Sequence, residues 1–510
     1  MSANLAGNLL ETTRHHANRV ALRLDDQRLT YADLDRSCAR VAGWLRERGI
    51  RPGDRVGIML PNVPDFAVAY YGTLRAGAVV VPMNVLLKRR EVAHHLGDSG
   101  AVLLLVWSGF EEEAAAGAAG AGTRCVAVGP GDLDALAAGA APLDEPADRE
   151  PADTAVILYT SGTTGRPKGA ELTHGSLTRN VEIARRLFGI DSASVVLGAL
   201  PLFHSFGQTC GLNASVAAGA TLTMLPRFEP GRALEVVARD RVTVLEGVPT
   251  MYAALLHHPG RERWDVSSLR LCVSGGASLP VEVLRGFEAA FGCVVVEGYG
   301  LSETSPLASF NRADRDRKPG SIGTPVDGVE MRVVDDAGAP LPPGEVGEIV
   351  IRGHNVMKGY WRQPEATAEA ISAGGWFRTG DLARVDEDGD FFIVDRKKDL
   401  IIRGGYNVYP REVEEVLYQH PAVRECAVLG VPHQELGEEV GAAVVLRPGA
   451  SAGAGELREF VRARIAAYKY PRHVWFVDEL PKTGTGKVLK RGITVPGGLA
   501  AAADAAAGNR

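Results

Sequence analysis

The chain has 510 residues, a formal net charge of −6 at pH 7, 45% hydrophobic residues and 23% charged residues. This length is more than one hydrophobic core supports, so two or more domains are expected. The negative net charge gives no indication of nucleic-acid binding, and no apolar run of the sequence is long enough to span a bilayer. Six scattered cysteines without a CxxC pair argue against a disulfide framework or a zinc site, and we expect a cytoplasmic protein.

The first part of the chain alternates short apolar runs with helix-like stretches. "RVGIML" at residues 55–60 precedes "PDFAVAYYGTLRAG" at 64–77, and "AVVVPMN" at 78–84 precedes "REVAHHLGDSG" at 90–100. This rhythm predicts βαβ units and a largely parallel sheet. The low-complexity run "EEEAAAGAAGAG" at 111–122 predicts a poorly constrained helix or a loop. Residues 137–153, rich in Ala, Pro and Asp, predict a surface connection.

Short strands with Gly, Pro and Asp turns replace this rhythm from residue 333 onward. "VVDDAGAPLPPGEVGEIVIRG" at 333–353 is typical of antiparallel structure, and "VDEDGDFFIVDR" at 385–396 predicts a hairpin about Asp388-Gly389. A smaller α+β segment follows "DRKKD". It has a predicted helix at 410–420 and predicted strands at 425–431 and 441–447.

The stretch "YTSGTTGRPKGAELTH" at 159–174 has the composition of a phosphate-binding loop. Glycine lets backbone N–H groups turn toward an anion, Ser and Thr add hydroxyl donors, and Lys adds charge. It is not a GxxxxGK[ST] loop, because Pro167 precedes Lys168 and Gly169 follows it. The later "PKTGTGKVLK" at 481–490 fails the same pattern, since Val488 follows Lys487.

Further stretches follow in a fixed order. They are "PLFHSFG" (201–207), "SGGASLP" (274–280), "EGYGLSET" (297–304), "RTGDLARVDEDGDFFIVDRKKDLIIRGGYNVYPREVEE" (378–415) and "PKTGTGKVLKR" (481–491). With the phosphate loop, they resemble the adenylate-forming superfamily of acyl-CoA synthetases, nonribosomal peptide adenylation domains and firefly-type luciferases. The resemblance extends from residue 29 to residue 491.

The resemblance, together with the element pattern, implies an α/β fold class. A large N-terminal domain of sheets sandwiched by helices, with a β-barrel-like subdomain, would occupy residues 1–395. Residues 396–399 would form a hinge, 400–495 a small mobile α+β domain, and 496–510 a disordered tail. Lys398 matches the hinge position of the family.

The resemblance also implies two half-reactions. A carboxylate attacks the α-phosphate of ATP to give acyl-AMP and pyrophosphate, and a thiol then displaces AMP. The first step gathers negative charge, so positioning and charge neutralisation matter most. ATP, Mg²⁺ and CoA are therefore the expected ligands, with a possible acyl carrier protein in place of CoA.

Individual roles follow from the matched motifs. Tyr299 would stack on adenine, and Asp381 and Arg396 would bind the ribose hydroxyls. Glu303 is the expected Mg²⁺ ligand, because Mg²⁺ in nucleotide sites takes one or two carboxylates plus phosphate oxygens. Lys487 would carry adenylation. The full expected ATP/AMP set is Thr160, Ser161, Gly162, Thr163, Thr164, Lys168, Gly276, Ala277, Glu297, Gly298, Tyr299, Gly300, Ser302, Asp381 and Arg396.

After adenylation, the small domain of this family rotates and presents a different loop to the site. Here that loop is "IIRGGYNVYP" at 401–410, and Gly404 and Gly405 would let the backbone approach the thiol of pantetheine.

The acyl pocket is assigned to the stretches around "PLFHSFG" and "EGVPTMY". His204, beside the acyl carboxylate, is the second catalytic candidate, and the full set is Phe203, His204, Gly207, Gly211, Gly247, Val248 and Met251. No buried acid is expected there to pair with an amino group, which disfavours an amino-acid substrate. Small and apolar residues suit a deep apolar slot.

The detailed resemblance is nearest to bacterial medium- and long-chain fatty acyl-CoA ligases, so the predicted activity is a fatty acid–CoA ligase. An aryl acid substrate and the loading of a carrier protein remain open. The related fatty acyl-AMP ligases, which load carrier proteins, carry an extra insertion in the large domain. No such insertion separates "SIGTPVDG" from "GEIVIRG" here, which favours CoA. A luciferase or a non-catalytic relative is disfavoured, the latter because Lys168, Glu303, Asp381 and Lys487 are all present.

Overall fold

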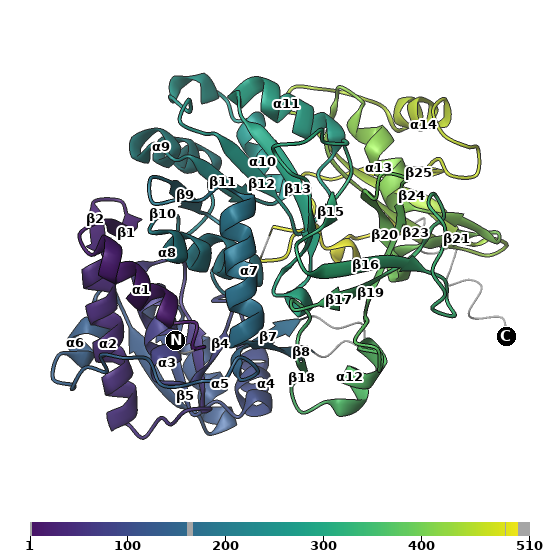
Figure 1. Cartoon of the computed structure of the whole chain (residues 1–510). Helices are drawn as coiled ribbons and strands as arrows, with labels where there is room; N and C mark the ends of the chain where they lie inside the picture. The colour runs from purple at the N-terminus through teal and green to yellow at the C-terminus, as the bar shows by residue number, and fades with distance from the viewer. Residues whose placement is uncertain (1–2, 161–166, 485, 498–510) are drawn as a thin grey trace.

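A computed structural model describes residues 3–160, 167–484 and 486–497. Figure 1 shows a large body built from the N-terminal and central parts of the chain, with a smaller body of C-terminal elements packed against one side. Helices cover the sheets of the large body, as expected of an α/β fold.

One sheet of the large body has the strand order β15-β14-β13-β12-β11-β9-β10-β1-β2. Its central pairs, from β13 to β1, are parallel, whereas β2, β14 and β15 pair antiparallel at its edges. The strands are β1 Val20–Leu24, β2 Gln27–Thr30, β9 Val195–Gly198, β10 Thr221–Met224, β11 Val244–Gly247, β12 Leu271–Ser274, β13 Val294–Gly300, β14 Leu307–Phe310 and β15 Thr324–Pro325.

A second sheet has the order β18-β8-β7-β4-β3-β5-β6. It is parallel from β7 to β6, and β7 and β8 form an antiparallel pair that flanks the predicted phosphate loop. The strands are β3 Arg55–Met59, β4 Val79–Pro82, β5 Leu103–Trp107, β6 Arg124–Val128, β7 Thr154–Thr160, β8 Lys168–Thr173 and β18 Gly359–Tyr360.

Two further sheets lie toward the C-terminus. The antiparallel sheet β16-β17-β19-β20 belongs to the large body, and the sheet β22-β21-β24-β23, with β25 beside β24, belongs to the small one. The strands are β16 Val329–Val334, β17 Gly347–Gly353, β19 Phe377–Val385, β20 Phe391–Arg396, β21 Ile401–Arg403, β22 Tyr406–Val408, β23 Val423–His433, β24 Gly437–Leu446 and β25 His473–Phe476.

The α-helices are α1 Gly7–His16, α2 Tyr31–Glu47, α3 Pro64–Arg75, α4 Arg89–Ser99, α5 Glu111–Ala121, α6 Asp132–Ala137, α7 His174–Leu187, α8 Ala214–Ala218, α9 Pro230–Asp240, α10 Pro249–Leu256, α11 Val281–Phe291, α12 Pro364–Ala370, α13 Pro410–Tyr418 and α14 Ala454–Arg462. A π-helix, η2, covers Phe206–Asn213, and single 3₁₀ turns include η4 Ser302–Thr304 and η5 Lys397–Asp399.

Local signals explain several of these boundaries. Thr30 caps α2 by accepting from the backbone N–H of Asp33, whose carboxylate in turn accepts from the N–H of Thr30. Pro64 and Pro410 stand in the first turn of α3 and α13, where a missing N–H costs nothing. The predicted hairpin joins β19 to β20, and Gly389 takes the positive φ of 85° at its turn.

The low-complexity run at 111–122 forms a regular helix, α5, so the loop alternative is wrong. Its small residues allow a close approach to α4: a Cβ added at Gly117 would lie 2.6 Å from the Cβ of Val92. The small Ala and Gly residues of α5 therefore allow close packing between the two helices.

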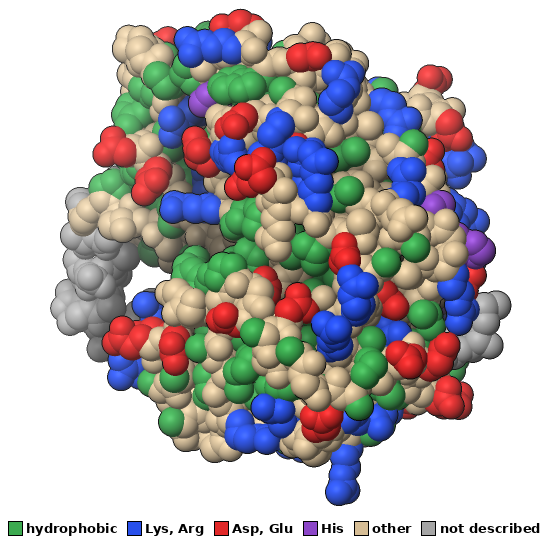
Figure 2. All heavy atoms as spheres, turned by 90° about the vertical axis from the view of Figure 1, so that its left-hand side faces the viewer, with side chains coloured by type: hydrophobic (Ala, Val, Ile, Leu, Met, Phe, Trp, Pro, Cys, Tyr) green, Lys and Arg blue, Asp and Glu red, His purple; other side chains and the backbone are tan. Residues whose placement is uncertain are grey.

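The two bodies have separate apolar cores. The small one is built around buried Val413, Leu417, Val428, Val440 and Leu457, and the main core of the large body lies between its sheets and helices. Within the described ranges, no helix is long and apolar enough to cross a membrane. Figure 2 shows basic and acidic side chains intermixed over the face it draws, in keeping with the modest net charge of −6.

A buried arginine helps to hold the surface connection at 137–153 to the large body. Arg75 is 1% exposed, and its Nε donates to the carbonyl of Leu143 at 2.6 Å. Its other nitrogens bind the carbonyl of Asp144 and the carboxylate of Asp35. The side chain at the end of α3 therefore adds three polar contacts to the backbone hydrogen bonds that this irregular segment makes with the large body.

Replacing Arg75 with Met should lower the free energy of unfolding by about 3 kcal/mol, because it leaves the Asp35 carboxylate and two carbonyls without a partner. The control is Arg36→Met, which removes an exposed pair with Asp33 and should cost less than about 1 kcal/mol. Equilibrium urea unfolding measures both variants. Equal losses would contradict the assigned role of Arg75.

Candidate active site

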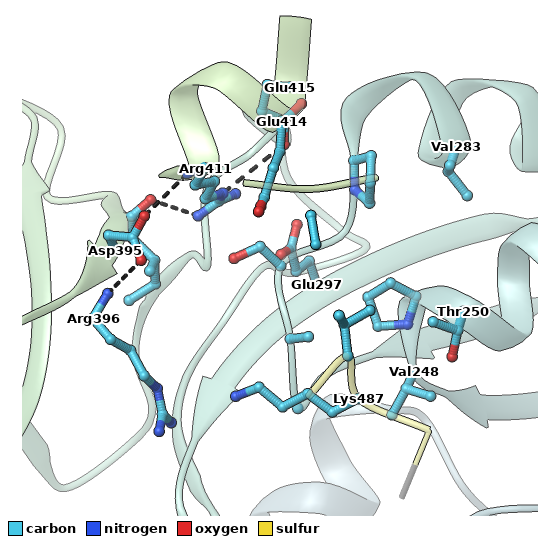
Figure 3. Close-up of a pocket in the computed structure, with 18 of the residues that line it drawn as sticks. Val248, Thr250, Val283, Glu297, Asp395, Arg396, Arg411, Glu414, Glu415 and Lys487 are labelled. Atoms are coloured by element: carbon cyan, nitrogen blue, oxygen red, sulfur yellow. Dashed lines mark hydrogen bonds and ion pairs between the residues drawn. The ribbon is translucent and has the colours of Figure 1, made fainter. Parts of the chain in front are cut away.

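A cavity of about 240 Å³ lies between the large and small bodies. The carboxyl ends of parallel strands β11, β12 and β13 open into it, which is the usual position of a ligand site in an open α/β sheet. Figure 3 shows Glu297 near its centre, with Arg396 to one side, Val248 and Thr250 to the other, and Lys487 entering from the C-terminal segment. The cavity therefore collects residues from the central and C-terminal parts of the chain.

Several of the predicted nucleotide-binding residues line this cavity together. They are Gly276, Ala277, Glu297, Gly298, Tyr299, Gly300, Asp381, Arg396 and Lys487. Two glycines at the end of β13, Gly298 and Gly300, leave no room for a side chain because backbone or ring atoms lie too close. A Cβ at Gly300 would lie 1.6 Å from the carbonyl oxygen of Pro306, and one at Gly298 would lie 2.2 Å from the ring of Phe310.

Asp381 joins two of these side chains. It is 4% exposed, accepts a hydrogen bond of 2.5 Å from Tyr299 Oη, and pairs with Arg396 Nε at 3.1 Å. Burial raises the pKa of Tyr299 well above its ordinary value, so the phenol stays a donor. The carboxylate of Asp381 in turn raises the pKa of Arg396. The three side chains form a fixed polar wall of the cavity.

Lys487 reaches this wall from the small body. Thr250 Oγ1 donates to the carbonyl of Gly486 at 2.9 Å, which ties the lysine's segment to α10. Burial, together with the charge of Arg396, lowers the pKa of Lys487 to about 8. The ammonium is thus held in a cavity where its own charge is only partly offset.

His204 lies close enough to Lys487 for the lysine's charge to affect it. Burial, with a contribution from Lys487, lowers the pKa of His204 to about 4. Its Nδ1 accepts from the backbone N–H of Phe206 at 3.3 Å. The imidazole is therefore neutral at neutral pH and offers a hydrogen bond, but no positive charge.

Thr160 and Lys168 face each other at the ends of β7 and β8. The predicted phosphate contacts Ser161, Gly162, Thr163 and Thr164 lie between them, outside the described residues. The Nζ of Lys168 lies 5.2 Å from the ring centroid of Tyr360.

Glu303 is 9% exposed, and its Oε1 accepts from Thr160 Oγ1 and Tyr360 Oη, each at 3.1 Å. The described residues contain no cluster of three or more His, Cys, Asp or Glu side chains that could enclose a metal. One carboxylate beside the phosphate loop nevertheless suits Mg²⁺, which in nucleotide sites takes few protein ligands and completes its shell with phosphate oxygens and water.

Some predicted residues lie away from the cavity lining. Ser302 begins η4, and Lys398 is exposed within η5. Gly404 and Gly405 are exposed in the turn between β21 and β22, with φ of 55° and 85°. The arrangement therefore presents Lys487 to the cavity, and not the loop predicted to contact a thiol.

Only Val248 of the predicted acyl-pocket set lines the cavity. Phe203 and His204 precede η2, Gly207 and Gly211 lie within it, and Gly247 and Met251 flank the start of α10. The expectation that this region lacks a buried acid is wrong. Glu246, at the end of β11, is 1% exposed, and burial raises its pKa to about 8.

Sequence reasoning also missed the wall supplied by α13. Arg411, Glu414 and Glu415 line the cavity, and the backbone N–H of Arg411 donates to Asp395 Oδ2 at 3.0 Å. In the sequence, these residues are the polar face of an amphipathic helix, which is indistinguishable from a solvated face. Glu246 did leave a signal, because an acid interrupts the apolar strand "TVLEGV".

Comparison with known proteins identifies the family. A profile described as AMP-binding enzyme matches residues 9–361, and one described as AMP-binding enzyme C-terminal domain matches residues 412–487. This chain belongs to the AMP-binding enzymes. Their two profiles match the large and small bodies that meet at the cavity.

Three relatives illustrate the range of the family. A feruloyl-CoA synthase of Amycolatopsis sp is 44% identical, over 94% of this chain and 96% of the relative. A long-chain-fatty-acid–CoA ligase of Bacillus subtilis is 38% identical, over 95% and 92%. ATP-bound MatB from Rhodopseudomonas palustris superposes with a TM-score of 0.90 at 37% identity, over 96% of this chain and 98% of that one.

Gly300→Ala should lower the free energy of unfolding by about 1–3 kcal/mol, because its Cβ cannot fit against the carbonyl of Pro306. Gly97→Ala makes the same chemical change at an exposed position of α4, where an added Cβ meets nothing within 4 Å. That variant should gain about 0.5–1 kcal/mol. Denaturant unfolding of the two variants should give shifts of opposite sign, and a neutral Gly300→Ala would contradict the close contact.

Proposed function

We propose that this AMP-forming acid–CoA ligase activates an aromatic carboxylic acid of the hydroxycinnamate type. The observation that carries the ligase chemistry is the meeting of Lys487, Asp381 and Arg396 in one cavity between the two bodies. Such a site concentrates positive charge where a carboxylate and a nucleotide phosphate must be brought together.

The reaction has two balanced steps. A carboxylate oxygen of the acid attacks the α-phosphorus of ATP, and the bond to pyrophosphate breaks, giving acyl-AMP. The sulfur of CoA then attacks the acyl carbon, the bond to AMP breaks, and the thiol proton is lost to solvent. The products are acyl-CoA, AMP and pyrophosphate.

Lys487 is assigned to the first step. Its ammonium would bind the incoming carboxylate and the α-phosphate and so stabilise the charge that develops at phosphorus. Asp381, held by Tyr299 and Arg396, would accept from the ribose hydroxyls. Neutral His204 would orient the carboxylate by hydrogen bonding and contribute no charge.

Glu303 and the hydroxyl of Thr160 would hold Mg²⁺ beside the phosphate loop. When bound, the ion supplies positive charge to the phosphate oxygens. Lys168 would contribute a second positive charge on that side of the site.

The second step is assigned to a different placement of the small body. Gly404 and Gly405 are exposed and outside the cavity lining, so they would reach the acyl-AMP only after the small body turns about residues 396–399. Lys398 would be part of this hinge, where few residues absorb the change in φ and ψ.

The 44% identical feruloyl-CoA synthase and the polar groups buried among the acyl-pocket segments favour the aromatic substrate. A long-chain fatty acid, the substrate predicted from the sequence, is the second candidate. It is favoured by the 38% identical fatty-acid ligase and by the small residues Gly207 and Gly211. Transfer to a carrier protein in place of CoA is a further outcome that the test below separates.

The test measures pyrophosphate release with ATP and Mg²⁺ for hydroxycinnamates, benzoates and straight-chain fatty acids, each with and without CoA, with mass spectrometry of the product. We expect CoA-dependent turnover of hydroxycinnamates at a kcat/KM at least about tenfold above that of any fatty acid. Preferred turnover of fatty acids would overturn the aromatic substrate. Acyl-AMP that accumulates and does not react with CoA would point to a carrier protein.

Lys487 gives the adenylation step a pH dependence. Its pKa of about 8 in the free protein means that the ammonium predominates below pH 8 and is lost above it. The kcat/KM for ATP reports the free enzyme, so it should fall about tenfold per pH unit above pH 8. Bound ATP raises the pKa, so kcat should hold to higher pH.

Lys487→Ala should remove the fall of kcat/KM above pH 8 and should slow acyl-AMP formation by on the order of 10²-fold. The same variant should still convert synthetic acyl-AMP and CoA to acyl-CoA. Lys88→Ala, at a lysine whose side chain is 73% exposed, is the control and should keep the wild-type profile. Equal loss of both half-reactions in Lys487→Ala would reject a role confined to the first step.

A further inference from the structure

Glu246 is a buried acid with one unsatisfied oxygen. It is 1% exposed, and its Oε1 has no hydrogen-bond partner within the described part of the chain. Burying a carboxyl oxygen without a hydrogen bond is costly, and buried polar groups in native proteins are nearly always satisfied. An acid with an unsatisfied oxygen at the end of a core strand therefore needs an explanation beyond the residues that the structure describes.

Side-chain alternation along β11 indicates the direction in which Glu246 points. Val248, two residues further on, lines the cavity and has an extended backbone with φ of −105° and ψ of 159°. Residues i and i+2 of an extended segment point to the same side, so Glu246 points to the side of Val248, one step deeper in the protein.

The π-helix η2 packs beside the carboxyl group of Glu246. A Cβ added at Gly211 would lie 3.4 Å from Glu246 Oε2, an ordinary van der Waals distance, so this residue of η2 is a near neighbour of the acid. A π-helix is a rare conformation that is frequent at functional sites. The family resemblance assigns the same segment to the acyl pocket.

The segments that neighbour Glu246, η2 and β12, carry further buried hydroxyl groups. The hydroxyl oxygens of Ser205, Thr209 and Ser274 are also buried and have no hydrogen-bond partner among the described residues. They come from the start of η2, its interior and the end of β12, beside β11.

The carboxyl group is neutral at neutral pH, because burial raises its pKa to about 8. A neutral carboxyl can both donate and accept one hydrogen bond. A substrate hydroxyl, which also donates and accepts, matches it better than an alkyl chain end, which does neither.

We propose that Glu246 is a specificity residue that hydrogen-bonds a hydroxyl group on the aromatic ring of the acyl substrate, at the end remote from its carboxylate. This inference rests on the proposed aromatic acid–CoA ligase function. It adds that the hydroxyl is recognised, and by which residue. A ring without the hydroxyl leaves Glu246 unsatisfied, and sites built to bond a hydroxyl reject analogues that lack it.

The experiment compares 4-hydroxycinnamate with cinnamate, which differ only in the ring hydroxyl. Pyrophosphate release with ATP, Mg²⁺ and CoA gives kcat/KM for each acid in the wild type, Glu246→Gln and Glu246→Leu. We expect the wild type to prefer the hydroxylated acid by at least about 30-fold. Glu246→Gln, which keeps a donor and an acceptor, should retain most of this preference, and Glu246→Leu should reduce it to about threefold or less by gaining activity on cinnamate.

Thr73→Val is the matched control. Thr73 is fully buried on α3, and its hydroxyl has no hydrogen-bond partner among the described residues, but it lies outside the acyl-pocket segments. This variant should keep the wild-type preference, and circular dichroism checks that each variant is folded. The wild-type comparison needs no variant, so the inference stays testable even if Glu246→Leu does not fold.

The results distinguish a failure of the role assigned to Glu246 from a failure of the proposed aromatic function. If the wild type converts both cinnamates at similar kcat/KM, or if Glu246→Leu keeps the full preference, recognition by Glu246 is wrong while the aromatic ligase function stands. If the wild type converts only straight-chain fatty acids, the proposed aromatic function is wrong, and recognition of a ring hydroxyl is wrong with it.

Discussion

The site depends on one unfavourable burial, that of the Lys487 ammonium at the contact between the two bodies. Burial and the nearby positive charge of Arg396 both disfavour the ammonium form, and its pKa is lowered to about 8. The hydrogen bond from Thr250 to the carbonyl of Gly486 holds the lysine's segment to the large body, and the ion pair between Lys490 and Glu414 holds it to α13. A buried cation with too little counter-charge is stabilised when an anion binds beside it. The unfavourable burial of Lys487 therefore increases the affinity of the cavity for phosphate and carboxylate groups.

Buried polar groups around the cavity fall into two kinds. Asp381 is held by Tyr299 and Arg396, so its geometry is fixed before any ligand arrives, and its carboxylate oxygens keep acceptor capacity for the ribose hydroxyls. Glu297 and Glu246 each keep one oxygen without a partner among the described residues. These two acids therefore have an oxygen free to meet groups that the described part of the chain does not supply.

The family resemblance pointed to the residues of the polar wall but not to Glu246, for a physical reason. Tyr299, Asp381, Arg396 and Lys487 stand in motifs that match the family, and they line one cavity. Taken alone, Tyr299 also suits a core, Asp381 a turn and Lys487 an exposed segment. Glu246 stands in an apolar strand, where burial depends on the neighbouring η2, and a π-helix has no clear sequence signature. The alternating strands and helices were predictable because periodicity is local. The contact of α13 with the large body was not, because it joins faces far apart in the chain.

The positions of two loops of the small body bear on the order of the reaction. Lys487 is inside the cavity, while Gly404 and Gly405 are exposed on the same body. In the proposed reaction, ATP supplies the counter-charge that makes burial of Lys487 favourable. Release of pyrophosphate removes most of that charge, so the closed contact loses stabilisation at the moment when adenylation is complete. The same electrostatic imbalance that promotes the first step would therefore favour release of the small body for the second.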